Sequence, residues 1–192
     1  MKHPLRSLAS WITAVALASC LATGAPAQPQ DSKNAKPSPE AQAPSKKPDV
    51  IFVPTPQEAV EKMLELAKVK AGDILYDLGC GDGRIVVAAA KKFGIKAIGV
   101  DIDPERVKES LENVKANNVE HVVTIKLADI LELDFSDASV VTMYLLPSLN
   151  VRLMPKLATL KPGTRIVSHD FDMRGAKPKQ VVQIDNDERE VP

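Results

Sequence analysis

The sequence has few of the residues that build disulfides, metal sites and aromatic surfaces. Its 192 residues include two cysteines, three histidines and only 4% aromatic residues. The cysteines and histidines are scattered along the chain, which gives no support to a zinc site. Because Cys20 lies in the N-terminal segment, the rest of the chain has Cys80 alone and no intrachain disulfide is expected there. A chain of this length fits one ordinary domain.

An excess of one charge is also absent. The 25 Lys and Arg residues balance 25 Asp and Glu residues, but the balance is the sum of two unlike segments. Residues 1–48 carry six basic and two acidic side chains, whereas residues 49–192 carry 19 basic and 23 acidic ones. A net acidic domain gains little from contacts with phosphates, so we expect no nucleic-acid partner.

The N-terminal residues 1–27 are predicted to be an export signal. Lys2 and Arg6 precede an apolar stretch over residues 8–21, and residues 25–27 form an Ala-Pro-Ala cleavage pattern. The apolar stretch is shorter than the roughly 20 residues that span a bilayer. Residues 17–20 (Leu-Ala-Ser-Cys) resemble the lipobox of bacterial lipoproteins, so a signal with lipidation of the cysteine is one alternative and a mitochondrial transit peptide is another. We therefore expect an exported or membrane-anchored protein, periplasmic or a lipoprotein in a bacterium and mitochondrial in a eukaryote.

Residues 28–48 are predicted to be a disordered linker. They contain Pro, Lys, Ser, Gln, Ala and Asn but no Val, Ile, Leu or aromatic residue, so they cannot bury enough surface to offset the entropy of ordering. The linker would act as a tether, and residues 49–192 would form the folded domain.

The domain alternates predicted strands and helices. Apolar runs bounded by Gly and Pro predict strands over residues 74–78, 97–100, 122–127, 139–145 and 164–168, with residues 181–184 as a candidate sixth strand. Helical periodicity predicts helices from Pro56 to before Gly72, over residues 84–93, from Pro104 to about Asn118, and over residues 148–160, the last one interrupted or bent near Pro155. This rhythm favours a doubly wound, mostly parallel α/β sheet with right-handed crossovers.

A glycine-rich loop joins the first predicted strand to the helix that follows it. Residues 77–83 read Asp-Leu-Gly-Cys-Gly-Asp-Gly, at the edge of the sheet where ligands bind in such folds. A dinucleotide fingerprint has the spacing G-x-G-x-x-G and holds a pyrophosphate, which the acid at the strand end would repel. That acid instead suits a ligand with an ammonium group, such as S-adenosyl-L-methionine. An NAD(P) oxidoreductase is therefore disfavoured.

Here the sequence resembles the class I S-adenosylmethionine-dependent methyltransferases, which have a Rossmann-like fold. The loop matches their first motif, and Asp101, 24 residues beyond Asp77, stands at the end of the second strand where the family binds the ribose hydroxyls. Asp129, which could also be an ordinary turn residue, stands at the family's adenine site. Asp103 is expected to cap the next helix and Arg84 to pair with Asp82. The cofactor-binding residues that the resemblance implies are Thr55, Asp77, Gly79, Cys80, Gly81, Asp101, Ile102, Asp129 and Ile130.

Three further segments resemble one subfamily more closely. They are residues 53–56 (Val-Pro-Thr-Pro), residues 144–147 (Tyr-Leu-Leu-Pro) with Asn150, and residues 162–169. The subfamily comprises mitochondrial lysine methyltransferases that act on the adenine nucleotide translocase and on the c-ring protein of ATP synthase, with their bacterial relatives. The resemblance implies methylation of a protein lysine, with a membrane protein among the candidates, and no metal. It implies that Thr55 helps close a lid over the cofactor and that Tyr144, Pro147 and Asn150 are catalytic residues that orient the substrate. His169 is a weaker candidate for proton removal.

The C-terminal part departs from the subfamily after Phe171. The expected strand pair that ends class I sheets has too little sequence left at normal length, so we expect it to be shortened. Two alternatives therefore stay open: a non-catalytic S-adenosylmethionine binder or degenerate scaffold, and a small-molecule N-methyltransferase.

Overall fold

The computed structural model describes residues 52–184. The predicted signal over residues 1–27 and the predicted linker over residues 28–48 lie outside this range. Within it, no helix has the length and apolar character needed to cross a membrane.

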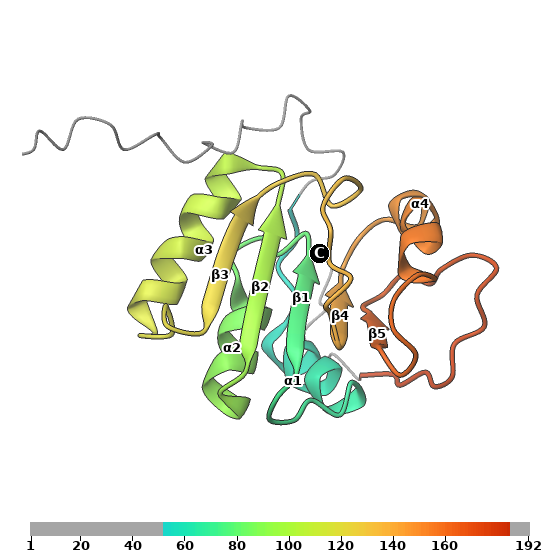
Figure 1. The fold of residues 1–192 in the computed structure, drawn as a ribbon, viewed down its shortest axis with the longest axis horizontal. Coiled ribbons are helices and arrows are strands. Elements are labelled where there is room, and N and C mark those ends of the chain that lie inside the picture. The colour runs from blue at the N-terminus through green and yellow to red at the C-terminus, as the bar shows by residue number, and fades with distance from the viewer. Residues whose placement is uncertain (1–51, 185–192) are drawn as a thin grey trace, which may run out of the picture. The chain divides into compact units, whose positions relative to one another are not determined.

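Five parallel strands form the sheet. They are β1 (Ile74–Leu78), β2 (Lys96–Asp101), β3 (Val123–Leu127), β4 (Val140–Met143) and β5 (Arg165–Ser168), in the order β3-β2-β1-β4-β5 (Figure 1). The chain begins at the central strand β1, moves outward to β3, and returns to place β4 on the other side of β1. The carboxyl ends of β1 and β4 therefore form the point where the strand order reverses, which is where such sheets bind ligands. The predicted fold class is confirmed.

The described residues form four helices. The helix α1 (Gln57–Leu66) precedes β1, whereas α2 (Arg84–Phe93), α3 (Pro104–Ala116) and α4 (Pro147–Leu157) each connect two strands. Local signals explain their limits. Asp103 caps α3, since its side chain accepts a hydrogen bond from the Glu105 N–H, and Pro104 occupies the first turn. Gly94, at φ 63°, ends α2 in the left-handed conformation. The helix α4 continues through Pro155, which lies in its last turn.

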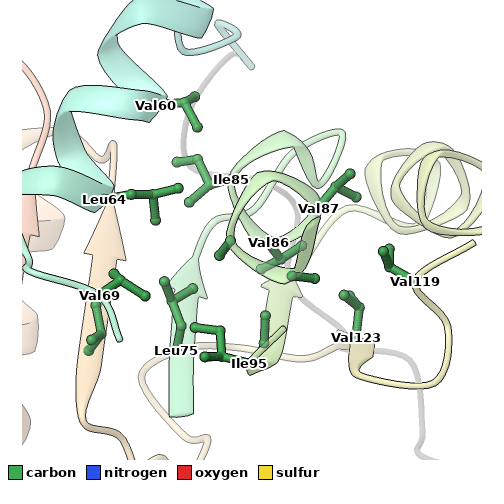
Figure 2. Close-up of a cluster of buried hydrophobic side chains, with 14 of the residues drawn as sticks. Val60, Leu64, Val69, Leu75, Ile85, Val86, Val87, Ile95, Val119 and Val123 are labelled. Carbon is green, nitrogen blue, oxygen red and sulfur yellow. The ribbon is translucent and has the colours of Figure 1, made fainter. Parts of the chain in front are cut away.

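Side chains alternate between two cores on opposite faces of the sheet. Leu75, Ala97 and Val140 point to one face, where α1 and α2 pack, and Figure 2 shows Val60, Leu64 and Ile85 of these helices in the same cluster as Leu75. The next residue on each strand (Tyr76, Ile98 and Val141) points to the other face, which α4 and the segment 128–138 cover. Helices on both faces leave the strand ends as the open edge of the sheet.

Two sequence predictions differ from the structure. The strand predicted over residues 139–145 is shorter, because Tyr144 and Leu145 leave the sheet and turn toward the glycine loop, where a methyl of Leu145 lies 2.7 Å from the place that a Cβ on Gly79 would occupy. The sixth strand predicted over residues 181–184 is wrong. These residues have no regular structure, and Val181 is 74% exposed, so their apolar run pairs with no neighbouring strand. In the described part of the chain no strand follows β5.

Candidate active site

A cavity opens at the carboxyl ends of β1, β2, β3 and β4. The predicted cofactor-binding residues meet there, although they are spread over 75 positions of the sequence between Thr55 and Ile130. Gly81 is the exception, since it is buried directly beside the cavity without lining it. The cavity wall includes Thr55, Asp77, Gly79, Cys80, Asp101, Ile102, Asp129, Ile130 and Tyr144 from the predicted set.

Asp77 lies at the end of β1 and is 2% exposed. Its Oδ1 accepts a hydrogen bond of 2.8 Å from the hydroxyl of Thr142 on β4. Burial raises the pKa of Asp77 to about 7, and the negative charges of Asp101 and Asp82 add to this effect, while the Thr142 hydrogen bond opposes it. Burial destabilises the ionised form of this carboxyl, and a positive group beside it would stabilise that form strongly. The site therefore favours a cationic ligand.

Asp101, at the end of β2, is held in a fixed orientation. Its Oδ2 accepts from the N–H of Gly81 at 2.9 Å, and its Oδ1 accepts from the N–H of Asp103 at 3.0 Å. Burial raises the pKa of Asp101, although the backbone hydrogen bonds counteract it. A carboxylate has about four acceptor positions, so these backbone contacts leave Asp101 able to accept from a ligand hydroxyl as well.

Asp129 follows β3 on the same wall. Its Oδ1 accepts from the N–H of Leu131 at 2.9 Å, which fixes the turn that carries it. The apolar side chains of Ile102 and Ile130 line the cavity near the ends of β2 and β3. A hydrogen-bond acceptor and two apolar side chains on one cavity wall are a suitable environment for a flat ring with an exocyclic amine. Asp129 is therefore both a turn residue and a wall of the cavity, so the two readings from the sequence are compatible.

Phe52 is a cavity residue that the sequence did not reveal. Its ring lies against Gly81, whose φ of 55° is in the left-handed region, and a Cβ on this glycine would overlap the ring. The guanidinium of Arg106 on α3 stacks at 4.9 Å from the centre of the same ring. Gly81 is thus required by its backbone conformation and by the close approach of Phe52.

Arg84, the first residue of α2, ties the segment 52–55 to the glycine loop. Its Nη2 forms the expected ion pair with Asp82, at 2.6 Å. Its Nη1 also donates to the carbonyl oxygen of Thr55 at 2.7 Å, a contact that sequence spacing cannot reveal because it joins residues 29 positions apart. Thr55 is 5% exposed and forms part of the cavity wall. This arrangement is compatible with the predicted role of Thr55 in covering the cofactor.

Tyr144 stands at the end of β4 and lines the cavity. Its hydroxyl donates to Asp170 Oδ2 at 3.0 Å, and its ring contacts the His169 ring edge-on at 4.6 Å between centres. Pro147 and Asn150, predicted with it as catalytic residues, do not line the cavity. Pro147 begins α4, and Asn150 is fully buried, where its amide donates to the carbonyl oxygens of Phe171 and Asp172. Their place in the structure is behind the cavity wall.

The donor set fits a cofactor that is cationic at one end and carries hydroxyls and an aromatic ring. In the described range no group of three or more His, Cys, Asp or Glu side chains is arranged to hold a metal ion. Cys80 is buried, and burial raises the pKa of its thiol well above its ordinary value, so it contributes packing rather than a reactive thiolate.

Comparison with known proteins identifies the family. The model of the ANTKMT methyltransferase domain matches residues 77–180. The chain belongs to this family. A protein-lysine N-methyltransferase of Saccharolobus islandicus is 51% identical to this methyltransferase over 141 residues, which are 72% of this chain and 88% of the relative. A human lysine N-methyltransferase named for the C subunit of ATP synthase is 30% identical over 131 residues, and the matched region spans only 55% of its length.

Solved structures agree with the family assignment. A crystal structure described as an RNA methyltransferase of Salinibacter ruber with S-adenosyl-L-homocysteine has a TM-score of 0.68 and 49% identity, and covers 70% of this chain and 88% of the other. A methyltransferase of Geobacter sulfurreducens, at 20% identity and a TM-score of 0.54, shares the fold. The resemblance to class I methyltransferases predicted from the glycine loop and the three strand-end acids is confirmed.

Proposed function

We propose that this methyltransferase transfers the methyl group of S-adenosylmethionine to the side-chain amine of a protein lysine. The observation that carries the proposal is the buried carboxylate of Asp77, which shares one cavity with Asp101, Asp129 and Tyr144. Similar chains named as lysine methyltransferases, and the S-adenosylhomocysteine bound to the Salinibacter protein, support it.

Different residues of the chain would bind different parts of the cofactor. Asp77 would hold the ammonium group of the methionine part, Asp101 the ribose hydroxyls, and Asp129 with its apolar neighbours the adenine. The cofactor would supply an activated sulfonium methyl, so the protein needs chiefly to place a neutral amine in line with it. Tyr144, on the wall at the end of β4, would accept a hydrogen bond from that amine and orient it.

RNA is the competing acceptor, because the description of the Salinibacter protein names it. Residues 52–184 carry 18 basic and 18 acidic side chains, so the described domain has no overall positive charge to attract phosphates. This balance favours the protein acceptor.

The test is transfer of a labelled methyl group by the full chain. Purified enzyme is incubated with labelled S-adenosylmethionine and with soluble protein, membrane protein or total RNA. We expect label that is removed by protease, resists ribonuclease, and is recovered as methyllysine after hydrolysis. Label released by ribonuclease would make the RNA acceptor correct, and cofactor binding without transfer would favour a non-catalytic binder.

A pair of variants tests the cofactor site in the same preparation. Asp101→Ala removes the acceptor expected for the ribose, and we expect cofactor affinity measured by calorimetry to fall at least about tenfold. Asp172→Ala, an exposed acid outside the cavity wall, should leave the affinity unchanged. Equal affinities in the two variants would contradict the assignment of Asp101.

We also propose that residues 1–48 direct and tether this enzyme outside the cytosol, so that a membrane protein is a suitable substrate. The basic start, the apolar stretch and the proline-rich linker support this proposal. Intact-mass analysis of the native protein from fractionated cells tests it. A mature start at Cys20 with added lipid, or at Gln28, would support export, and an unprocessed start at Met1 in the cytosolic fraction would refute it.

A further inference from the structure

The ends of β4 and β5 place two short segments side by side at the cavity. Met143 and Ser168 are register partners, and the ladder continues one step further because the N–H of His169 donates to the carbonyl oxygen of Met143 at 3.0 Å. Tyr144 therefore emerges next to residues 169–171, which follow it by about 25 positions in sequence. The Tyr144 ring contacts two of their rings, edge-on to His169 and stacked at 6.0 Å on Phe171.

The turn after β5 is built around Asp170. This residue has φ 59°, a left-handed conformation that Asp tolerates better than most side chains. The N–H of Phe171 donates to the carbonyl oxygen of His169 at 2.6 Å across the turn. The hydroxyl of Ser168 and the amide of Asn150 both donate to the Phe171 carbonyl oxygen, at 2.6 and 3.3 Å. The buried Asn150 thus anchors from behind the turn that carries Asp170.

This anchored turn brings the Asp170 carboxylate to the Tyr144 hydroxyl. The hydroxyl donates to Oδ2 at 3.0 Å, although about a third of the Asp170 side chain is exposed. A tyrosine hydroxyl has a single proton, so one that donates to a carboxylate can serve any other group only as an acceptor. A group approaching Tyr144 through the cavity must therefore bring a donor.

We propose that Asp170 is a positioning residue for the methyl acceptor and acts through Tyr144. It keeps the phenolic proton turned away from the incoming group, so that the Tyr144 oxygen accepts an N–H and leaves the nitrogen lone pair directed elsewhere, toward the reacting methyl. The inference rests on the proposed function, because it concerns an amine acceptor. The pair would also be selective, because a methyl acceptor that has only lone pairs and no hydrogen to donate cannot form a hydrogen bond with the Tyr144 oxygen.

The test is a double-mutant cycle in the full chain, measured with the lysine acceptor found by the transfer assay. Asp170→Gly removes the carboxylate at a position whose φ suits glycine, and Tyr144→Phe removes the hydroxyl. We expect each single variant to lower kcat about tenfold with little change in cofactor affinity, and the double variant to match Tyr144→Phe within about twofold. Asp170→Asn keeps an amide oxygen as acceptor and tolerates the same φ, so it should recover most of the rate.

Two results would overturn the inference: a rate for Asp170→Gly equal to that of the wild type, or losses that multiply to about a hundredfold in the double variant. The second would mean that Asp170 acts independently of Tyr144. Asp172→Gly, two residues along the same turn, is the matched control and should keep the wild-type rate.

A spectroscopic arm separates this inference from the proposed function. The chain has two tyrosines, so the phenolic carbon signals in a ¹³C-tyrosine spectrum can be assigned with Tyr144→Phe. We expect Asp170→Gly to shift the Tyr144 signal and leave the Tyr76 signal in place. A wild-type enzyme that binds cofactor but methylates no lysine would refute the proposed function, whereas an unshifted Tyr144 signal would refute the hydroxyl–carboxylate pair itself.

Discussion

Replacing Asp77 by Asn should make the enzyme without cofactor more stable at neutral pH while weakening its cofactor binding. Burial raises the pKa of this carboxyl from 3.8 to about 7, so the folded state binds its proton more tightly than the unfolded state does. Stability from such a group is fully present below the unfolded pKa and is lost as the pH rises through the folded one. The shift of about three units corresponds to about 4 kcal/mol at 1.36 kcal/mol per unit.

The assay is urea unfolding between pH 5 and pH 8, followed by far-ultraviolet circular dichroism without cofactor. Over this interval we expect the wild-type free energy of unfolding to fall by about 3 kcal/mol, since most of the linkage lies between pH 5 and pH 7. Asp77→Asn should remove most of this fall. Asp101, whose pKa burial also raises, should leave a smaller slope of the same sign in both proteins.

Cofactor binding should show the opposite trend, because an ionised Asp77 attracts an ammonium group. Wild-type affinity measured by calorimetry should rise with pH up to about 7, and Asp77→Asn should bind more weakly at every pH. A wild-type stability that is flat from pH 5 to pH 8, or a variant with the wild-type slope, would refute the reasoning about this buried carboxyl.

Three further substitutions test the packing around the cavity. Gly81→Ala should lower cofactor affinity at least about tenfold, because its methyl would displace the Phe52 ring. The control Gly94→Ala, at a similar positive φ with no described atom within 4 Å of the added carbon, should lower stability only. Equal cofactor affinities of the two variants in calorimetry would contradict the packing argument. Asn150→Ala removes buried hydrogen bonds and should lower the free energy of unfolding by about 1–3 kcal/mol. It should also reduce kcat more than cofactor affinity. An unchanged kcat would show that the turn after β5 keeps its shape without the Asn150 amide. Arg165→Met removes the ion-pair partner of Asp73, whose carboxyl is buried, and should lower the free energy of unfolding in urea by about 3 kcal/mol. A loss below about 1 kcal/mol would indicate that the neighbouring hydrogen bonds of Asp73 suffice.

Much of the fold was readable from the sequence because glycine and proline mark its element ends. The limits of β1 and α2 match the prediction, since Gly79 and Gly94 interrupt the apolar runs that define them. The strand predicted over residues 181–184 failed for a different reason. A short apolar run shows that a segment is able to pair, but pairing also needs a neighbour in space, and the sequence does not say whether β5 has one on its outer side.

Some residues of the candidate site could likewise be predicted from the sequence, and others could not. Asp77, Asp101 and Asp129 could be predicted because parallel strands bring their carboxyl ends to one edge, so that sequence position alone predicts their proximity. Phe52 and Asp170 could not be predicted, since Phe52 is placed by packing on Gly81 and Arg106, which are distant in sequence, and Asp170 by a turn that the distant Asn150 anchors. The Asn150 anchor illustrates the limit: its motif was recognised, but only the packing shows that its amide supports the turn after β5.

The contact of residues 52–55 with the glycine loop has a practical consequence for making shortened versions of this enzyme. A chain that starts at Pro56 would retain every helix and strand of the described residues, so its circular dichroism and urea unfolding should indicate a folded domain. It would nevertheless lack Phe52 and the Thr55 carbonyl, and with them one wall of the cofactor cavity. A preparation of that kind would report a falsely weak cofactor affinity. Truncations should therefore begin well before Phe52, and affinity tags are better placed at the other end of the chain.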